Sequence, residues 1–332
     1  MAETMRRAFV TGGTGFLGRH LLERLSASGW EVWALHRSPG PPAFFGELGI
    51  RPRRGDVTDP GCVLEVMPEG IDTVFHLAAD TTPWRGARKR QQAVNIGGTE
   101  AVIAAARAKG ARRLLHVSTC SVWGHHRAGI DENTPQRGHD SWVGYVRSKA
   151  EAEARVRVAA AGGLDAVIVN PAHILGRYDS AGWARLFFLI AHDGLPGVPP
   201  GGGCFAEAGA VADAMIVAAE RGNCGENYIL GGPHAPFLEV VEEIARLLNK
   251  PAPKRASPTL LIKAVARLGD VKSRFTGKPP DLTPEAAYFV CHDERVSSAK
   301  AEAELGYRPR EIADSLADCH AWLRAAGLLP ES

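Results

Sequence analysis

Short apolar runs rich in β-branched residues recur through the first half of the chain, and longer amphipathic segments separate them. The short runs predict strands, and the longer segments, with apolar positions at helical spacing, predict helices. The predicted strands are Ala8–Thr11, Glu31–His36, Arg51–Gly55, Thr73–His76, Leu114–Ser118 and Ala166–Asn170. The predicted helices between them are Phe16–Ser28, Pro60–Met67, Ala87–Lys109 and Tyr145–Ala161.

Strands that are apolar almost throughout and alternate with helices indicate a parallel sheet covered on both faces. Right-handed crossovers then give an α/β fold with a doubly wound, Rossmann-type sheet. After about Pro171 the loops lengthen, which indicates a smaller, mainly helical C-terminal lobe that covers one edge of the sheet. Its predicted elements are the helices Ala208–Glu220, Leu238–Leu248, Thr259–Arg274, Ser298–Leu305 and Ile312–Ala326, and the strand Asn227–Leu230.

Composition narrows the class of protein. The chain has 332 residues, and its formal net charge of +2 is too small to indicate a nucleic-acid partner. No apolar run is long enough for stable membrane insertion, and no secretory signal precedes the first strand. The six cysteines form no C-x-x-C pair, so we expect reduced thiols in a cytoplasmic protein without a metal site.

A glycine-rich turn follows the first strand directly. Gly12, Gly15 and Gly18 have the spacing G-x-x-G-x-x-G and open the first helix. Glycines permit a tight turn and a close approach of the backbone to a pyrophosphate, which the helix N-terminus then binds. This context predicts a dinucleotide-binding domain over residues 1–170, with a substrate-binding lobe over residues 171–332 and the chain crossing between them.

The end of the second strand indicates which dinucleotide binds. NAD enzymes place a carboxylate there against the ribose 2′-hydroxyl, but this chain has His36, Arg37 and Ser38. A guanidinium suits a 2′-phosphate, so NADP is favoured over NAD; the alternative is an ordinary surface arginine. Asp56, after the third strand, is suited to accept from the adenine amine or, equally, to cap the following helix.

A tyrosine and a lysine stand four residues apart in the segment after the fifth strand. Tyr145 and Lys149 therefore share one helix face, where an ammonium lowers the pKa of a phenol and prepares it for proton transfer. A Tyr-x-x-x-Lys match alone is common by chance, but this one lies where a catalytic helix would begin. Ser118 and Thr119 end the fifth strand, with hydroxyls suited either to hold a substrate oxygen or to form local caps.

With these motifs in place, the sequence resembles the extended short-chain dehydrogenase/reductase family, also called the NAD-dependent epimerase/dehydratase family, and within it dihydroflavonol reductase-like and 3β-hydroxysteroid dehydrogenase-like members. The resemblance covers nearly the whole chain. It rests on TGGTGFLG at 11–18, GDVTD at 55–59, VFHLAA at 74–79, VNIGGTE at 94–100, VSTCSVWG at 117–124, YVRSK at 145–149, NYILGG at 227–232 and SSAKAEAELGYRP at 297–309.

The resemblance implies roles for individual residues. Tyr145 would be the acid–base residue, Lys149 would bind the nicotinamide ribose and depress the Tyr145 pKa, and Thr119 would hold the substrate oxygen, with Ser118 as the fallback. Asn95 would fix the helix and strand near the site. Other cofactor contacts are expected from Thr14, Phe16, Leu17, Val57, Leu77, Ala78, Ala79, Pro171 and His173. The resemblance also implies a homodimer, formed through the helices 87–109 and 145–161.

Two departures bear on the reaction. The family's dehydratases carry Asp-Glu after the catalytic Thr, and this chain has Cys120-Ser121. Residues 203–214, where epimerases of the family place an Arg that clamps a diphosphate, contain no Arg. The expected substrate side is instead aromatic, although each such residue alone is more often core: Thr81, Trp84, Cys120, Trp123, Trp183, Phe187 and Phe205, with His125 and His173 beside them.

Three functions follow in order of preference. The first is an NADP-dependent oxidoreductase, a carbonyl reductase or alcohol dehydrogenase acting on a small-molecule ketone, aldehyde or secondary alcohol. The second is an NAD-dependent epimerase of a sugar or sugar nucleotide. The third is a catalytically inactive NADP-sensing binding protein. The amphipathic, basic helix Thr259–Arg274 is suited to touch a membrane or a hydrophobic substrate, though packing within the lobe is the simpler interpretation.

Overall fold

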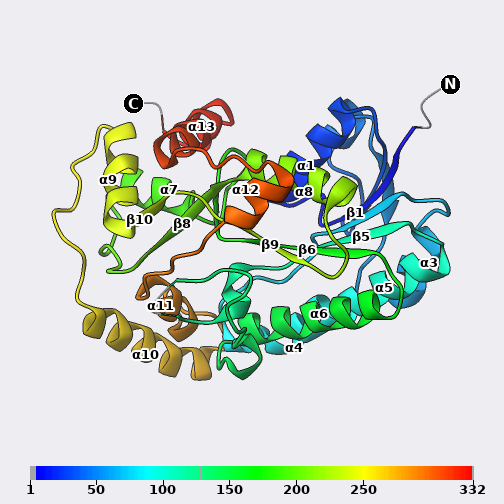
Figure 1. Cartoon of the computed structure of the whole chain (residues 1–332). Helices are drawn as coiled ribbons and strands as arrows, with labels where there is room; N and C mark the ends of the chain where they lie inside the picture. The colour runs from blue at the N-terminus through cyan, green and yellow to red at the C-terminus, as the bar shows by residue number, and fades with distance from the viewer. Residues whose placement is uncertain (1–4, 127–128, 331–332) are drawn as a thin grey trace.

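The computed structural model describes residues 5–126 and 129–330. Within them, one parallel sheet has the strand order β3-β2-β1-β4-β5-β6-β9, which reverses direction beside β1 as a doubly wound sheet requires (Figure 1). Its strands are β1 (Arg7–Thr11), β2 (Glu31–His36), β3 (Arg51–Arg54), β4 (Thr73–His76), β5 (Arg113–Val117), β6 (Ala166–Pro171) and β9 (Asn227–Leu230). The fold class predicted from the alternation of apolar runs and helices is confirmed.

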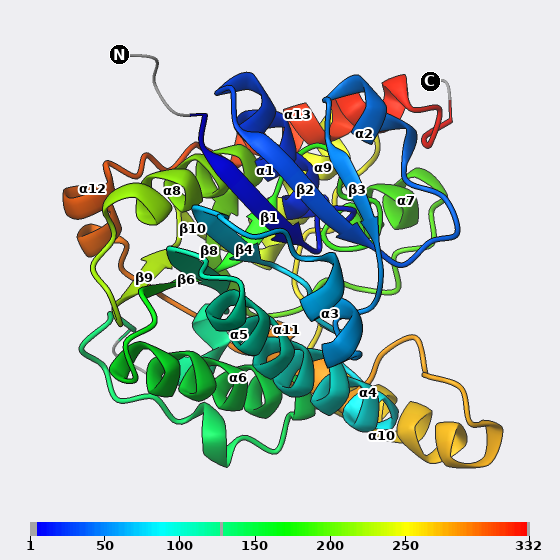
Figure 2. The ribbon, with the colours of Figure 1, turned by 90° about the vertical axis from the view of Figure 1, so that its right-hand side faces the viewer.

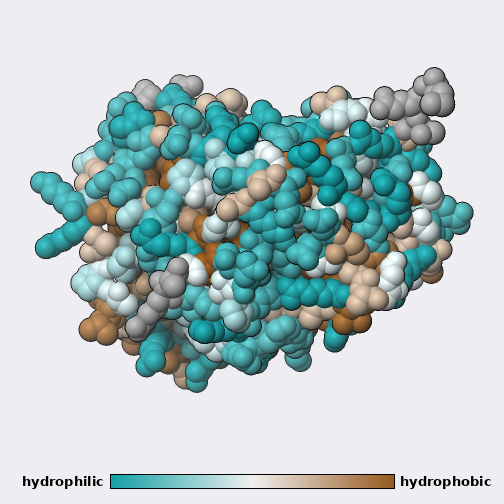
Figure 3. Space-filling model, in the orientation of Figure 1, coloured by the Kyte–Doolittle hydropathy of each residue, from teal (hydrophilic) through white to brown (hydrophobic). Residues whose placement is uncertain are grey.

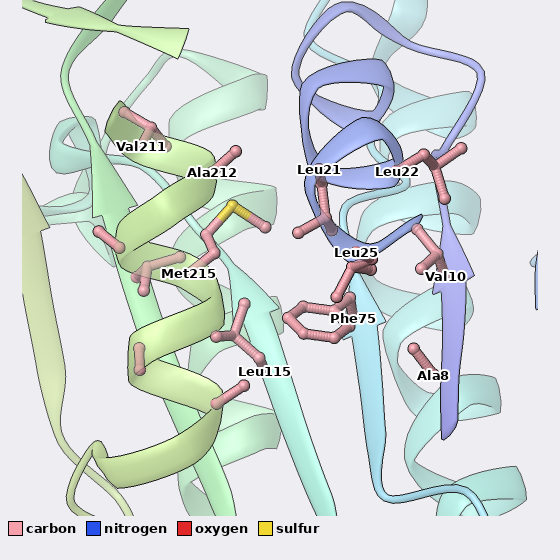
Figure 4. Packing of buried hydrophobic residues seen from close by; sticks show 14 of the residues in the cluster. Ala8, Val10, Leu21, Leu22, Leu25, Phe75, Leu115, Val211, Ala212 and Met215 are labelled. Atoms are coloured by element: carbon pink, nitrogen blue, oxygen red, sulfur yellow. The ribbon is translucent and has the colours of Figure 1, made fainter. Parts of the chain in front are cut away.

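Helices cover both faces of this sheet (Figures 1 and 2). On one face α1 (Phe16–Ala27) and α8 (Ala208–Arg221) lie side by side, and their apolar side chains meet those of the central strands. Figure 4 shows Leu21 and Leu25 of α1 and Met215 of α8 converging on Phe75 and Leu115 of the sheet. On the other face a second apolar cluster joins the sheet to α3 (Pro60–Val66), α5 (Gly98–Ala108) and α6 (Gly144–Ala161).

The rest of the chain builds a lobe beside the sheet. A small sheet with the order β10-β8-β7 packs with helices around its own apolar cluster, whereas β9 and α8 return to the main sheet. No helix among the described residues is long and apolar enough to cross a bilayer. The elements of this region are β7 (His173–Leu175), α7 (Arg185–Ala191), β8 (Gly202–Glu207), β10 (His234–Pro236), α9 (Phe237–Leu247), α10 (Thr259–Thr276), α11 (Pro284–Val290), α12 (Ala299–Leu305) and α13 (Ile312–Ala325).

Two stretches differ from the sequence prediction. The single helix expected over 87–109 is divided into a 3₁₀ turn, α4 (Arg88–Gln91), a π-helical segment over Gln92–Gly97 and α5. The wide turn coincides with Asn95, whose side chain bonds the neighbouring loop, and such π segments often mark functional positions. The short helices α2 (Ala43–Glu47), α7 and α11 were also missed, because each is too brief to show a clear period.

A buried polar chain crosses the sheet beside the glycine-rich turn. His76, at the end of β4, pairs its Nδ1 with the Thr11 hydroxyl at 2.7 Å and its Nε2 with the Thr99 hydroxyl at 3.0 Å. Burial, with the nearby Lys149 charge, lowers the His76 pKa to about 3, and the same two causes lower the pKa of His116 on β5. Both imidazoles are therefore neutral in the folded protein.

These histidines predict acid sensitivity. The ordinary His76 pKa of 6.5 falls to about 3 on folding. At pH values between these two pKa values, His76 binds a proton in the unfolded chain but not in the folded chain. Stability is therefore lost as the pH falls. We expect urea unfolding to show about 2 kcal/mol less stability at pH 5 than at pH 7 from His76 alone. His76→Gln should flatten this dependence, while His192→Gln, at an exposed site, should leave it unchanged; an unaltered slope in His76→Gln contradicts the assignment.

Candidate active site

The glycine-rich turn is built by close backbone approaches. Gly12 has φ +74°, and a Cβ there would lie 2.7 Å from the backbone N of Ala78; a Cβ on Gly18 would lie 2.1 Å from the Gly12 carbonyl oxygen. Helix α1 begins after Gly15 with no side-chain cap and no acidic residue in its first turn. The N–H groups of that turn thus remain available to an anion. The turn therefore fits the pyrophosphate of a dinucleotide.

The residues predicted to bind the adenosine part of the cofactor lie at the carboxyl ends of β2 and β3. His36 is buried with its Nδ1 3.3 Å from the Ser38 hydroxyl, whereas the Arg37 side chain is 72% exposed and lies 3.9 Å from the Asp56 carboxylate. Asp56 accepts from the backbone N and hydroxyl of Thr58 at 2.9 Å each. Its alternative role as a helix cap is wrong, because α3 is capped by Asp59.

Other predicted cofactor residues lie along the same sheet edge. Leu77 and Ala78 contact Gly12, and Thr14 is exposed in the turn. Phe16 and Leu17 open α1, and Val57 packs under Gly98. Pro171 ends β6, and Ala79 lies between Ala78 and the Asn95-bonded Asp80. The Ser118 hydroxyl is buried without a protein partner in the described part of the chain, so it is free to bind a ligand.

Tyr145, Thr119 and Lys149 converge at the carboxyl end of β5. The Thr119 hydroxyl lies close enough to the Tyr145 hydroxyl to lower its pKa. Thr119 also accepts from the Ser121 backbone N at 3.2 Å, so the local cap considered from the sequence exists as well. Lys149 is buried and its Nζ donates to the Val117 carbonyl at 2.7 Å. A proton donor, a hydroxyl and an ammonium therefore share one strand end.

Burial shifts the pKa values of both Tyr145 and Lys149. Desolvation raises the Tyr145 pKa to about 12, and the Thr119 hydroxyl offsets only part of that rise. The expectation that Lys149 depresses this pKa stays a prediction; in the protein without ligand the Lys149 ammonium donates to the Val117 carbonyl. Burial lowers the pKa of Lys149 itself to about 8, against the opposing charge of Glu153. Tyr145 is therefore a protonated phenol at neutral pH, suited to donate.

The buried carboxylate of Glu153 stabilises the carboxyl end of β5, where Thr119 lies. Glu153, one turn after Lys149 on α6, is fully buried and accepts from the side chains of Asn170, Asn227 and Gln136 at 2.7 to 2.9 Å, and pairs with Arg157. The Asn170 amide also donates to the Thr119 carbonyl at 3.2 Å. This network holds β5, β6 and α6 in register and thereby fixes Thr119 against Tyr145.

A pocket opens beside Tyr145, and sequence reasoning missed most of its wall. It is lined by Ser121, Gly124, His125, Val146, Tyr288, Phe289, His292 and Glu294. The ring of Phe289 lies 6.5 Å from that of Tyr145, and the rings of His125 and His292 lie 4.5 Å apart. Burial raises the pKa of Glu294, which hydrogen-bonds Cys120. The only available signal was the density of aromatic and titratable residues over 288–294.

With the geometry established, comparison with known proteins identifies the family. The family model described as "NAD dependent epimerase/dehydratase family" matches residues 8–231. The chain belongs to this family. Its relatives are enzymes of the extended short-chain dehydrogenase/reductase type, and the chain is an NAD(P)-dependent enzyme of that type.

Similar proteins span almost the whole chain. "Sterol demethylase protein B" of Methylococcus capsulatus is 30% identical and is matched over 96% of this chain and 99% of its own length. A "4-hydroxy-2-methyl-3-oxo-4-farnesyl-3,4-dihydroquinoline-1-oxide ketoreductase" of Stigmatella aurantiaca is 34% identical over 92% of each chain. The solved structure titled "Crystal structure of gox2253" has a TM-score of 0.84 and 28% identity, over 97% of this chain and 99% of that one.

Several residues expected on the substrate side of this family member lie elsewhere. Trp123 is 1% exposed and donates from Nε1 to the Thr134 carbonyl, within a core cluster. Phe187 and Phe205 are core residues of the C-terminal lobe. Trp183 packs on Phe205 at 5.0 Å between ring centres, beside His173, so these aromatics serve packing rather than the pocket next to Tyr145.

His173, Cys120, Thr81 and Trp84, which were also expected on the cofactor or substrate side, do not line the pocket. Burial lowers the His173 pKa to about 4, so its ring is neutral among aromatic neighbours. Cys120 is buried beside Glu294, and burial raises its pKa. Thr81 is exposed, and Trp84 covers Gly86 with its Nε1 unpartnered among the described residues. Of the residues expected on the substrate side, His125 lines the pocket, and Cys120 precedes the lining residue Ser121.

The glycine-rich turn gives a direct prediction for cofactor binding. Gly18→Ala should weaken NADPH and NADH binding by at least about tenfold, because the new Cβ overlaps the Gly12 carbonyl and distorts the turn. Gly46→Ala is the matched control, since a Cβ there meets nothing within 4 Å and the site is helical. Calorimetric titration measures both variants. Unchanged affinity in Gly18→Ala would exclude this turn as the dinucleotide site.

Proposed function

We propose that this enzyme is an NADP-dependent carbonyl reductase or alcohol dehydrogenase that interconverts an apolar ketone or aldehyde with its alcohol. The observation that carries the proposal is the protonated Tyr145, close to the Thr119 hydroxyl beside a pocket lined by Tyr288 and Phe289. A phenol with a pKa near 12 holds its proton until an oxygen atom develops negative charge next to it.

Thr119, Tyr145 and Lys149 have different roles in the proposed reaction. In reduction, the Thr119 hydroxyl holds the carbonyl oxygen and Tyr145 gives it a proton; in oxidation, the phenolate form of Tyr145 accepts the alcohol proton. Lys149 keeps positive charge beneath the strand end, which favours the phenolate left after proton transfer. A bound nicotinamide supplies or accepts the hydride.

The pocket favours an apolar carbonyl over a nucleotide sugar. Among the residues that the structure describes, its walls are mainly aromatic and histidine side chains with one carboxyl, and none of these lining residues is Arg or Lys. The segment 203–214, which contains no Arg, forms most of the buried strand β8 and the start of α8. A diphosphate without a cation nearby is poorly held. Two relatives whose names describe a sterol and a farnesylated quinoline ketone support the same substrate class.

The reaction is tested with Tyr145. The wild-type enzyme should consume NADPH with alkyl or aromatic ketones, and Tyr145→Phe should lower the turnover by about 10²- to 10⁴-fold because the proton donor is lost. NADPH binding should persist in that variant. Tyr178→Phe is the matched control, since the Tyr178 hydroxyl pairs with Glu23, away from the pocket. If the Tyr145→Phe variant keeps its turnover, proton donation by Tyr145 is excluded. Copurified NAD with saturable UDP-sugar binding would favour epimerisation instead.

Cofactor preference is tested with Arg37. The exposed guanidinium next to Asp56 is placed to bind a 2′-phosphate. Arg37→Ala should lower kcat/KM for NADPH by about tenfold or more, because hydrogen bonds to a charged phosphate are lost, and should leave kcat/KM for NADH nearly unchanged. NADH thereby serves as the control within one variant. An equal loss with both cofactors, or none with NADPH, would argue against NADP preference.

A further inference from the structure

Helix α10 presents its apolar side chains outward. Leu260, Leu268 and Phe275 are 82%, 73% and 87% exposed, and Leu261, Val265 and Val271 are at least half exposed. The buried positions of the same helix are small or polar, namely Ala266, Asp270 and Ser273. This polarity is the reverse of a helix that packs by its apolar face. Packing within the lobe, the simpler sequence interpretation, therefore does not account for the apolar residues.

Polar contacts hold the inner face of α10 to the protein. The Asp270 carboxylate pairs with Arg85, outside the helix, at 3.0 Å. Its pairing with Arg274 at 3.5 Å and the bond from the Ser273 hydroxyl to the Asp270 carbonyl at 2.7 Å lie within α10 and orient this face. Helix α11 packs alongside, and Thr283 at its start bonds the Pro83 carbonyl. The helix is thus anchored without its leucines, which remain free for another surface.

The exposed charge around these leucines is mainly positive. The only carboxylate within α10 is Asp270, which is buried and paired. The exposed charged residues on the helix and in the segments next to it are seven cations and one carboxylate, Asp281: the cations are Lys254, Arg255, Lys263, Arg267, Lys272, Arg274 and Lys278. An exposed apolar stripe bordered by lysine and arginine is the pattern of helices that lie in the interface of an anionic bilayer. Brown residues gather at the lower left of Figure 3, where Figure 1 places α10.

We propose that α10 is an in-plane anchor that seats this enzyme on an anionic lipid surface. The apolar stripe would enter the acyl boundary while the cations meet lipid phosphates. A second copy of the chain fits less well, because two such helices face to face would bring like charges together with no exposed carboxylate on either helix to offset them. The pocket residues Tyr288 and Phe289 lie on α11, next to this surface. The proposal does not depend on the proposed reaction, since lipid binding is measured without turnover.

Flotation with vesicles tests the apolar part. The whole enzyme should float with vesicles of phosphatidylcholine and phosphatidylglycerol. Leu268→Ser should weaken this binding by about tenfold, because a leucine side chain no longer leaves water. Leu64→Ser on α3, which removes another exposed leucine, is the matched control and should float as the wild type does. Equal flotation of the Leu268→Ser and Leu64→Ser variants would overturn the assignment of α10.

The charge requirement has its own variants. Arg267→Glu should weaken binding to the anionic vesicles by about fivefold or more, and added salt should weaken the wild type. Arg185→Glu, an exposed charge reversal on α7, should have no effect. Equal wild-type binding to vesicles of phosphatidylcholine alone would overturn the electrostatic assignment. If sedimentation without lipid shows self-association that Leu268→Ser abolishes, while vesicles bind nothing, a second copy covers this face and the proposal is wrong.

Discussion

The side-chain amide of Asn95 joins the cofactor half of the site to the catalytic half. Its oxygen accepts from the Asp80 backbone N at 2.7 Å, and its nitrogen donates to the Asp80 carbonyl at 3.0 Å and to the Ser148 hydroxyl at 2.9 Å. Ser148 in turn donates to the Tyr145 carbonyl. One buried amide thus ties the loop after β4, which contacts the glycine-rich turn, to the helix that carries Tyr145. Tyr145 can meet a bound nicotinamide only if these two segments keep a fixed separation.

This arrangement places a cation beside neutral histidines. The Lys149 ammonium lies under β5, and its charge helps to lower the pKa values of His76 and His116. Those imidazoles must stay neutral, because His76 joins the Thr11 and Thr99 hydroxyls, and Thr99 donates to the Asn95 carbonyl at 2.6 Å. The charge that assists proton transfer and the network that positions Tyr145 therefore share one desolvated interior. The same interior makes the fold sensitive to acid.

The parts of this structure that were predictable from the sequence depend on neighbours along the chain. A glycine turn between a strand and a helix, or Tyr145 one turn before Lys149, defines its own geometry. The wall of the pocket does not, because Phe289 reaches Tyr145 only through the path of the C-terminal lobe. The sequence alone also does not tell a core phenylalanine from a pocket phenylalanine. Phe205 belongs to the core of the C-terminal lobe, whereas Phe289 lines the pocket. The path of the folded chain decides which aromatic residues lie in the core and which line the pocket.

The C-terminal lobe combines two features that suit the proposed reduction of apolar carbonyls. Residues 288–294 give the pocket an aromatic wall with few charges, and α10, just before them in the chain, carries an apolar surface bordered by cations. A substrate poorly soluble in water is concentrated in lipid, so an enzyme held at that surface meets it without an aqueous transfer step. The inward-facing Asp270 makes this arrangement compatible with folding, since its ion pair with Arg85 secures α10 while the leucines stay outside. Under the two proposals, the reversed polarity of α10 would place the pocket next to the lipid surface in which an apolar substrate dissolves.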